Sequence, residues 1–341
     1  MTLNILFMTI KRDGLVCLDY GHYFEREVGR IANCEWAGRG WPLHKSESLD
    51  STVRRVMPDV DWVIYYDFEV RRESLPIKVP PPHRRRYKVA TITSDIHKKP
   101  GEHITDLNNG PWDAFLMLYT MLGAEINYQK GKGWKKTDQN QFLQRLHSPI
   151  FPLTPSIEPS VFNMFSAERD IDAMFLGNAT RYVYPLRFDI YHNLKALGIK
   201  NKWKTIVRWS PKGKSLERKK QEYLDRGDIV GEKYADYLSR TKCFLFGTSV
   251  FKYPLLKFFE GMASGACVFS DLPLQWEMFH FKPGENMVLI SEENWQEKLK
   301  YYLDNEGERK RIALEGYRMT MRHHTNEARA QELVKFLEEN R

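Results

Sequence analysis

Short apolar runs alternate with longer segments of helical periodicity along the whole chain. In the first half, four runs are so apolar that we expect strands covered on both faces, as in a parallel sheet. These runs are Leu3–Ile10, Asp61–Tyr66, Tyr87–Thr93 and Asp113–Tyr119. An amphipathic stretch from His22 to Ala32 predicts one helix, and Ser48 is suited to cap another that ends before Pro58.

The same alternation continues in the second half. We expect strands at Ile171–Leu176, Lys204–Trp209, Cys243–Phe246, Cys267–Phe269 and Asn286–Ile290. We expect helices at Pro185–Leu197, Tyr234–Ser239, Leu255–Ala263, Asn294–Leu303 and from Glu306 to Asn340. Two successive series of strand and helix predict an α/β protein with two doubly wound, Rossmann-like domains.

A proline-rich connector separates the two series. Ser148–Pro159 carries four prolines in twelve residues, which favours an extended chain. We therefore expect an N-terminal domain over residues 1–155, a second over 156–325, and a final helix at 326–341 that packs back on the first. Ligands of such sheets bind beyond the carboxyl ends of the strands, so the expected active site is a cleft between the domains.

Composition excludes several classes of protein. The longest nearly apolar run, Cys243–Phe251, is far shorter than the roughly 20 residues of a membrane span. The first ten residues lack the basic region and cleavage site of a signal peptide. Four scattered cysteines form no CxxC pair, which favours a reducing cytoplasm over a zinc or disulfide framework. The net charge of +8 is spread over both halves and suits an anionic ligand.

The segment Phe251–Asp271 (FKYPLLKFFEGMASGACVFSD) carries the most specific pattern. Within a helix, Lys257 and Glu260 would lie one turn apart on one face. By itself this spacing also fits a surface ion pair. The whole segment resembles the donor-site signature of GT-B glycosyltransferases, the spore-maturation-type enzymes and the bacteriophage DNA β-glucosyltransferases in particular. The resemblance implies that Glu260 binds the ribose of a nucleotide sugar and Lys257 its diphosphate.

Two departures from that family pattern bear on the mechanism. The relatives usually have Arg where this chain has Lys257. Retaining members often carry a second Glu eight residues before the first, where this chain has Lys252. The second departure argues against a retaining reaction with two Glu residues. An inverting displacement is therefore expected.

Further donor-binding residues follow other predicted strands. A glycine lets the backbone approach a phosphate, and arginine neutralises it. The resemblance places the Gly177–Asn178 turn and Arg181 at the diphosphate, and Arg208 ends a strand at the same edge. Arg187 could serve there or lie on the solvent face of its helix. The turn at Val230 would offer backbone groups to the nucleotide base.

The catalytic base is expected at the end of the YKVATIT strand. An acceptor hydroxyl needs a positioned base within hydrogen-bond reach. Ser94-Asp95-Ile96 resembles the segment that supplies this base in the phage enzymes, which makes Asp95 the candidate and His97 the second choice. A turn-capping role for Asp95 is the alternative.

The acceptor is expected at the N-terminal domain. Trp36 and Trp41 flank a Gly-rich stretch with Gly38 that resembles a loop of the spore-maturation-type enzymes and could stack on a sugar or base. Arg85 and Lys132 belong to two basic runs that would meet phosphates of DNA or of a lipid carrier, or would simply be solvated.

Together these residues predict a cytoplasmic glycosyltransferase that moves a sugar from a nucleotide diphosphate sugar, UDP-sugar above all, to an acceptor hydroxyl. The cations at the donor site would stabilise the leaving diphosphate, so we expect neither metal nor cofactor. The acceptor is open between a modified DNA base, a glycan and a lipid-linked sugar, and peripheral membrane contact is compatible with it. A nucleotide-sugar epimerase of the same architecture and a non-catalytic nucleotide-binding module are the alternatives. Sugar, base and oligomeric state are not determined by the sequence.

Overall fold

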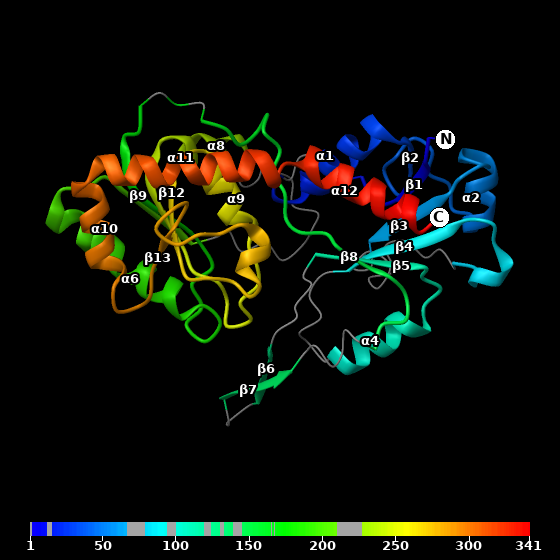
Figure 1. The fold of residues 1–341 in the computed structure, drawn as a ribbon, viewed down its shortest axis with the longest axis horizontal. Helices are drawn as coiled ribbons and strands as arrows, with labels where there is room; N and C mark the ends of the chain where they lie inside the picture. Colours follow the sequence, from blue (N-terminus) through cyan, green and yellow to red (C-terminus); the bar gives the residue numbers. More distant parts are fainter. Residues whose placement is uncertain are drawn as a thin grey trace. The chain divides into compact units, whose positions relative to one another are not determined.

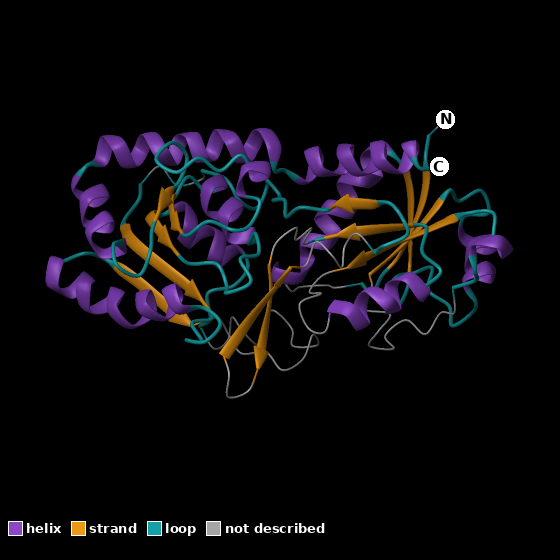
Figure 2. Ribbon diagram, turned by 60° about the horizontal axis from the view of Figure 1, so that its bottom comes forward, coloured by secondary structure: helices purple, strands orange, loops and turns teal. Residues whose placement is uncertain are grey.

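The computed structural model describes residues 2–11, 16–66, 79–93, 100–118, 124–129, 133–138, 145–164, 166, 168–209 and 227–341. Two compact units make up the chain. Unit 1 comprises residues 1–13, 21–154 and 326–341, and unit 2 comprises residues 14–20 and 155–325. Each has its own sheet (Figures 1 and 2). Each also has its own buried apolar core.

Unit 1 contains a parallel sheet of six strands in the order β2-β1-β3-β4-β5-β8. The strands are β1 (Asn4–Met8), β2 (Asn33–Ala37), β3 (Trp62–Tyr66), β4 (Lys88–Thr93), β5 (Ala114–Met117) and β8 (Ile150–Pro152). Both faces of the central strands are covered, which explains their continuous apolar runs. A separate antiparallel hairpin joins β6 (Ala124–Gln129) to β7 (Gly133–Asp138).

Helices cover the sheet of unit 1 on both faces (Figure 1). They are α1 (Val16–Ile31), α2 (Leu49–Val56), α4 (Pro100–Asn109) and α12 (Asn326–Glu339). The short 3₁₀ helix η1 (Pro82–Arg84) buries no side chain. On one face, Phe24 of α1 and Leu333 of α12 pack on Phe7 of β1, whereas Val53 of α2 packs on the other face. The C-terminal helix thus completes the core of unit 1.

Unit 2 contains a parallel sheet of five strands in the order β10-β9-β11-β12-β13. The strands are β9 (Ile171–Gly177), β10 (Thr205–Trp209), β11 (Thr241–Leu245), β12 (Cys267–Ser270) and β13 (Val288–Leu289). The helices are α6 (Pro185–Asn201), α8 (Glu232–Ser239), α9 (Leu256–Ala263), α10 (Trp295–Asp304), α11 (Glu306–His323) and the 3₁₀ helix η2 (Trp276–Phe279). Figure 2 shows helices on both sides of these strands.

The two faces of this sheet bury different side chains of the same strands. Phe175 of β9 packs with α6 and α10, whereas Met174 and Leu176 pack with α8 and α9. Alternate strand residues point to opposite faces, so one apolar strand contributes side chains to two cores. The fold is therefore the predicted α/β arrangement of two doubly wound units.

The structure also differs from the sequence prediction in places. The helical stretch expected from Glu306 to Asn340 consists of α11, which ends at His323, and α12, which starts at Asn326, the first residue of the expected final helix. Trp36 lies in the edge strand β2 and not in a loop. Part of the basic run around Lys132 forms strand β7. The predicted cap is correct: the Ser48 hydroxyl accepts a hydrogen bond from the Ser51 amide.

Candidate functional site

The strand order of unit 2 places a topological switch point at the carboxyl end of β9. From β9 the chain proceeds to β10 on one side, and β11 then pairs with the other side of β9. The connecting segments therefore leave in opposite directions at this point, which is where doubly wound sheets bind ligands. Gly177 ends β9, and Gly247 follows β11.

Arg187 bridges these two strand ends. Its Nε donates to the carbonyl of Gly247, and Nη1 donates to the carbonyl of Asn178 at 3.4 Å. The guanidinium lies 4.0 Å from the ring centre of Tyr184, and the residue is only 4% exposed. Burial lowers the pKa of Arg187 to about 10, against the opposing effects of Tyr184 and Asp271. The solvent-facing alternative for Arg187 is therefore wrong.

Lys257 brings a second cation to the same place. Its Nζ donates to the carbonyl of Leu176 at 2.7 Å, one residue before the strand ends. A Cβ built on Gly177 would lie 3.8 Å from this Nζ and 3.7 Å from Nη1 of Arg187. Burial lowers the pKa of Lys257 to about 8, with Arg187 acting in the same direction and Glu260 opposing it. Two desolvated cations thus converge on one glycine.

Glu260 lies one turn further along α9. It is 4% exposed, and its Oε2 accepts a hydrogen bond of 2.9 Å from the hydroxyl of Tyr234 in α8. Burial and the neighbouring carboxylate raise the pKa of Tyr234 well above its usual value. The ring of Tyr234 also lies 5.6 Å from Nζ of Lys257. Lys257 and Glu260 therefore do not form the surface pair that the helix spacing alone also allowed.

Other predicted donor residues border this cluster. Asn178 follows Gly177, and its Oδ1 accepts from both the amide and the hydroxyl of Thr180, which fixes the turn. Arg181 is exposed and lies 5.6 Å from the ring of Phe188. Arg208 is exposed on the edge strand β10, next to Leu176 in the strand register, and Val230 is half-buried just before α8. Their contact with a donor stays a prediction.

A polar group that the sequence analysis overlooked follows β11 and β12. Asp271 accepts hydrogen bonds from the amide of Thr248 at 2.6 Å and from its hydroxyl at 2.7 Å. Lys252 pairs with the same carboxylate and has a left-handed backbone, with φ of 55°. A signal for Asp271 is present in the sequence. This residue directly follows the VFS strand, and ligands bind at the carboxyl ends of parallel strands.

The predicted catalytic residues Asp95 and His97, and Lys132 of the acceptor set, lie outside the residues that the structure describes. Trp36 stacks on Phe7 with ring centres 5.7 Å apart and donates from Nε1 to Glu25 at 2.8 Å. Trp41 stacks on Trp36 at 5.8 Å. A Cβ on Gly38 would lie 2.2 Å from the carbonyl oxygen of Thr9, so this glycine permits a close approach of two backbones.

Arg85 is engaged within unit 1. Its fully buried guanidinium pairs with Asp113 at 2.5 Å. It also donates to the carbonyl oxygens of Pro80, Tyr87 and Pro111. The solvated-loop alternative is wrong for Arg85, because these contacts join the segment before β4 to the one before β5. Its role toward an acceptor stays a prediction.

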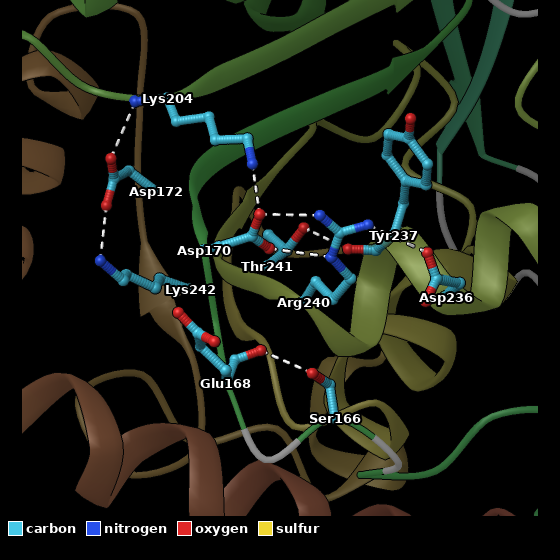
Figure 3. A network of polar contacts seen from close by, with 10 residues as sticks. All are labelled: Ser166, Glu168, Asp170, Asp172, Lys204, Asp236, Tyr237, Arg240, Thr241 and Lys242. Atoms are coloured by element: carbon cyan, nitrogen blue, oxygen red, sulfur yellow. Dashed lines mark hydrogen bonds and ion pairs between the residues drawn. The ribbon is translucent and has the colours of Figure 1, made fainter.

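Two Asp-x-Asp sequences, at 59–61 and 170–172, precede β3 and enter β9 respectively. Asp170 pairs with Arg240 at 2.7 Å and with Lys204, and Asp172 pairs with Lys242 at 2.6 Å (Figure 3). These carboxylates lie at the amino end of β9. Six residue steps of roughly 3.3 Å, or about 20 Å, separate that end from Gly177. Among the described residues, no three His, Cys, Asp or Glu side chains are grouped to hold a metal ion.

The described helices offer no candidate membrane span. Within the described ranges, none is both long enough and apolar enough to cross a bilayer.

Known proteins resemble this chain in the sequence of unit 2 and in the fold. Residues 169–335 match the family model described as glycosyl transferase-like. The sucrose-phosphate synthase of Thermosynechococcus elongatus has a TM-score of 0.60 at 11% identity, with 99% of this chain and 98% of that one covered. HepE of Anabaena, solved with UDP-glucose, has a TM-score of 0.55 at 11% identity, covering 99% and 100%.

TarM, a Staphylococcus aureus protein, has a TM-score of 0.54 at 10% identity over 81% of this chain. The chain spans only 54% of the length of TarM. No curated protein matches in sequence. Residues 169–335 thus match the glycosyl transferase-like family, and the chain shares the two-domain GT-B fold of these solved structures.

Proposed function

We propose that the chain transfers a sugar from a nucleoside diphosphate sugar to an acceptor hydroxyl, and that the donor binds at the carboxyl end of β9. The convergence of Lys257 and Arg187 on Gly177 carries this proposal. A diphosphate placed against a glycine at a strand end meets no Cβ and two cations. In a water-poor site, fixed charges of this kind stabilise a leaving diphosphate without reorganisation.

Glu260 would bind the ribose hydroxyls of the donor. Its carboxylate is buried and held by Tyr234, so a sugar hydroxyl that donates to it forms a charge-assisted hydrogen bond. The fold shared with HepE, whose structure contains UDP-glucose, supports UDP as the nucleotide. The half-buried backbone at Val230, just before α8, would contact the base.

Donor binding would proceed without a metal ion. The carboxylates of the Asp-x-Asp sequence on β9 lie at the amino end of the strand and are paired with Arg240, Lys204 and Lys242. At the carboxyl end, Lys257 and Arg187 supply the positive charge that a metal would otherwise bring.

The reaction would invert the anomeric centre. Lys252 stands where retaining relatives carry a second Glu, and it pairs with Asp271. Asp95, two residues beyond the end of β4, would take the proton of the acceptor hydroxyl, with His97 as the second candidate. The acceptor itself, a modified DNA base, a glycan or a lipid-linked sugar, is left to experiment.

Titration calorimetry with UDP tests the donor site. We expect Lys257→Gln to weaken UDP binding about tenfold or more, since a hydrogen bond to a charged group contributes about 1.5–3 kcal/mol. Lys195→Gln, at an exposed lysine of α6, is the matched control and should bind like the wild type. Equal affinity of the two variants would place the diphosphate elsewhere. Turnover of UDP-glucose to another UDP-sugar without acceptor would instead favour an epimerase.

A further inference from the structure

A cavity of about 360 Å³ lies in unit 2 and includes none of the predicted donor residues in its lining. Its walls come from two elements. One is the segment after η2, with His280, Lys282 and Glu285. The other is the last part of α11, where the spacing of the lining residues follows one helix face. These α11 residues are Glu315, Arg318, Met319, Arg322 and His323.

The wall opposite α11 is held in place by Asn286, a buried residue. Its Oδ1 accepts from the amide of Lys282 at 2.7 Å, and its Nδ2 donates to the carbonyl of His280 at 2.8 Å. His280 itself has a left-handed backbone, with φ of 57°, which is costly for a residue with a Cβ. This geometry places its ring against that of His323, with the ring centres 4.2 Å apart.

Two of the cationic side chains in the lining are paired with carboxylates of the lining. Lys282 pairs with Glu285 at 3.3 Å, and Arg318 pairs with Glu315 at 2.6 Å. Among the residues that the structure describes, Arg322 has no hydrogen-bond or ion-pair partner. Its guanidinium can therefore bind an anion bidentately without first breaking an internal contact.

We propose that this cavity, called here the His–Arg pocket, binds a small phosphate-bearing anion through Arg322, His280 and His323. Its volume suits a small ligand. A cavity of this volume does not enclose an extended polyanion such as DNA. The paired imidazoles offer further ring N–H donors on the same anion.

Imidazole resonances from isotope-labelled histidine test the proposal in the full-length protein. Inorganic phosphate is titrated at constant ionic strength. We expect saturable shifts of His280 and His323, and a dissociation constant about tenfold weaker in Arg322→Gln. Lys310→Gln, at an exposed lysine of the same helix outside the pocket, is the matched control.

A further variant distinguishes phosphate binding in the pocket from binding at the donor site. Lys257→Gln should leave the phosphate shifts of His280 and His323 unchanged, whether or not it still binds UDP. Shifts that grow linearly without saturation would overturn the proposal, as would equal dissociation constants for Arg322→Gln and Lys310→Gln. The unliganded spectra of the variants show whether each is folded.

Discussion

The hydroxyl of Tyr234 donates a hydrogen bond of 2.9 Å to Oε2 of Glu260. This contact joins α8 to α9, and both residues are buried. A buried carboxylate is stable only when hydrogen bonds replace its hydration. Tyr234 is therefore a positioning residue: it holds the carboxylate that we assign to the donor ribose.

Removing that hydroxyl should weaken both the fold and the donor site. Tyr234→Phe keeps the ring and removes the donor, so the free energy of unfolding should fall by about 1–3 kcal/mol. UDP affinity should fall less than in a variant that lacks Glu260, because the carboxylate stays in place. Urea denaturation and calorimetry measure the two effects. A variant with unchanged UDP affinity would give Tyr234 a purely structural role.

Removing the carboxylate tests the ribose contact. Glu260→Ala should weaken UDP binding about 10–150-fold, the equivalent of about 1.5–3 kcal/mol for a charged hydrogen bond. Glu297→Ala, at an exposed position of α10, is the control for a lost surface charge. Unchanged affinity in a folded Glu260→Ala protein removes this residue from the site.

Donor binding should depend on pH through Lys257. Its pKa of about 8 means that the free protein carries this charge below pH 8 and loses it above. A diphosphate attracts only the charged form, so binding above pH 8 must be accompanied by proton uptake. UDP affinity should therefore be flat up to about pH 8 and decline from there toward pH 9. In Lys257→Gln the decline should disappear, and calorimetry over pH 7–9 compares the two.

The sequence predicts the strands and helices of unit 2 that carry the candidate donor site, because their apolar patterns are local. Gly177 ends β9, and α9 (Leu256–Ala263) starts one residue after the expected start at Leu255. Such local patterns need no knowledge of distant contacts. The contact of Tyr234 with Glu260 could not be predicted in this way, because the two residues are 26 positions apart in the sequence.

Other features depend on contacts that no local pattern reveals. Arg85 belongs to a basic run typical of a solvated loop, yet Asp113 and three carbonyl oxygens bury it. Strand β2 contains Asn33 and Glu35 and lies at the edge of its sheet, so it lacks the apolar run of a central strand. The break between α11 and α12 has neither proline nor glycine. There His324 is fixed by a contact with the carbonyl of Phe279.

The charge network at the amino end of β9 should stabilise the protein at neutral pH and lose this contribution in acid. Arg240 and Lys204 hold the pKa of Asp170 well below its usual range (Figure 3). A depressed folded-state pKa adds stability above the unfolded value of about 4, and this is lost as pH falls toward the folded value.

Asp170→Asn should therefore destabilise the protein at pH 7 and progressively less below about pH 4. Melting temperatures of the wild type and Asp170→Asn at pH 7 and pH 3 measure this loss of stability. Asp304→Asn removes an exposed carboxylate paired only within α10 and should change the melting temperature less. A destabilisation by Asp170→Asn that is the same at pH 7 and pH 3 would contradict an electrostatic origin.

The catalytic base is the remaining assignment to be tested. In the sequence, Asp95 comes two residues after Thr93, the last residue of β4. Asp95→Asn keeps the side-chain shape and removes the proton acceptor. UDP affinity should therefore hold while sugar transfer falls about 10²–10⁴-fold, the usual contribution of general base catalysis. His97→Ala should cost much less. Transfer by Asp95→Asn near the wild-type rate, or a product that keeps the anomeric configuration of the donor, would refute the inverting mechanism through Asp95.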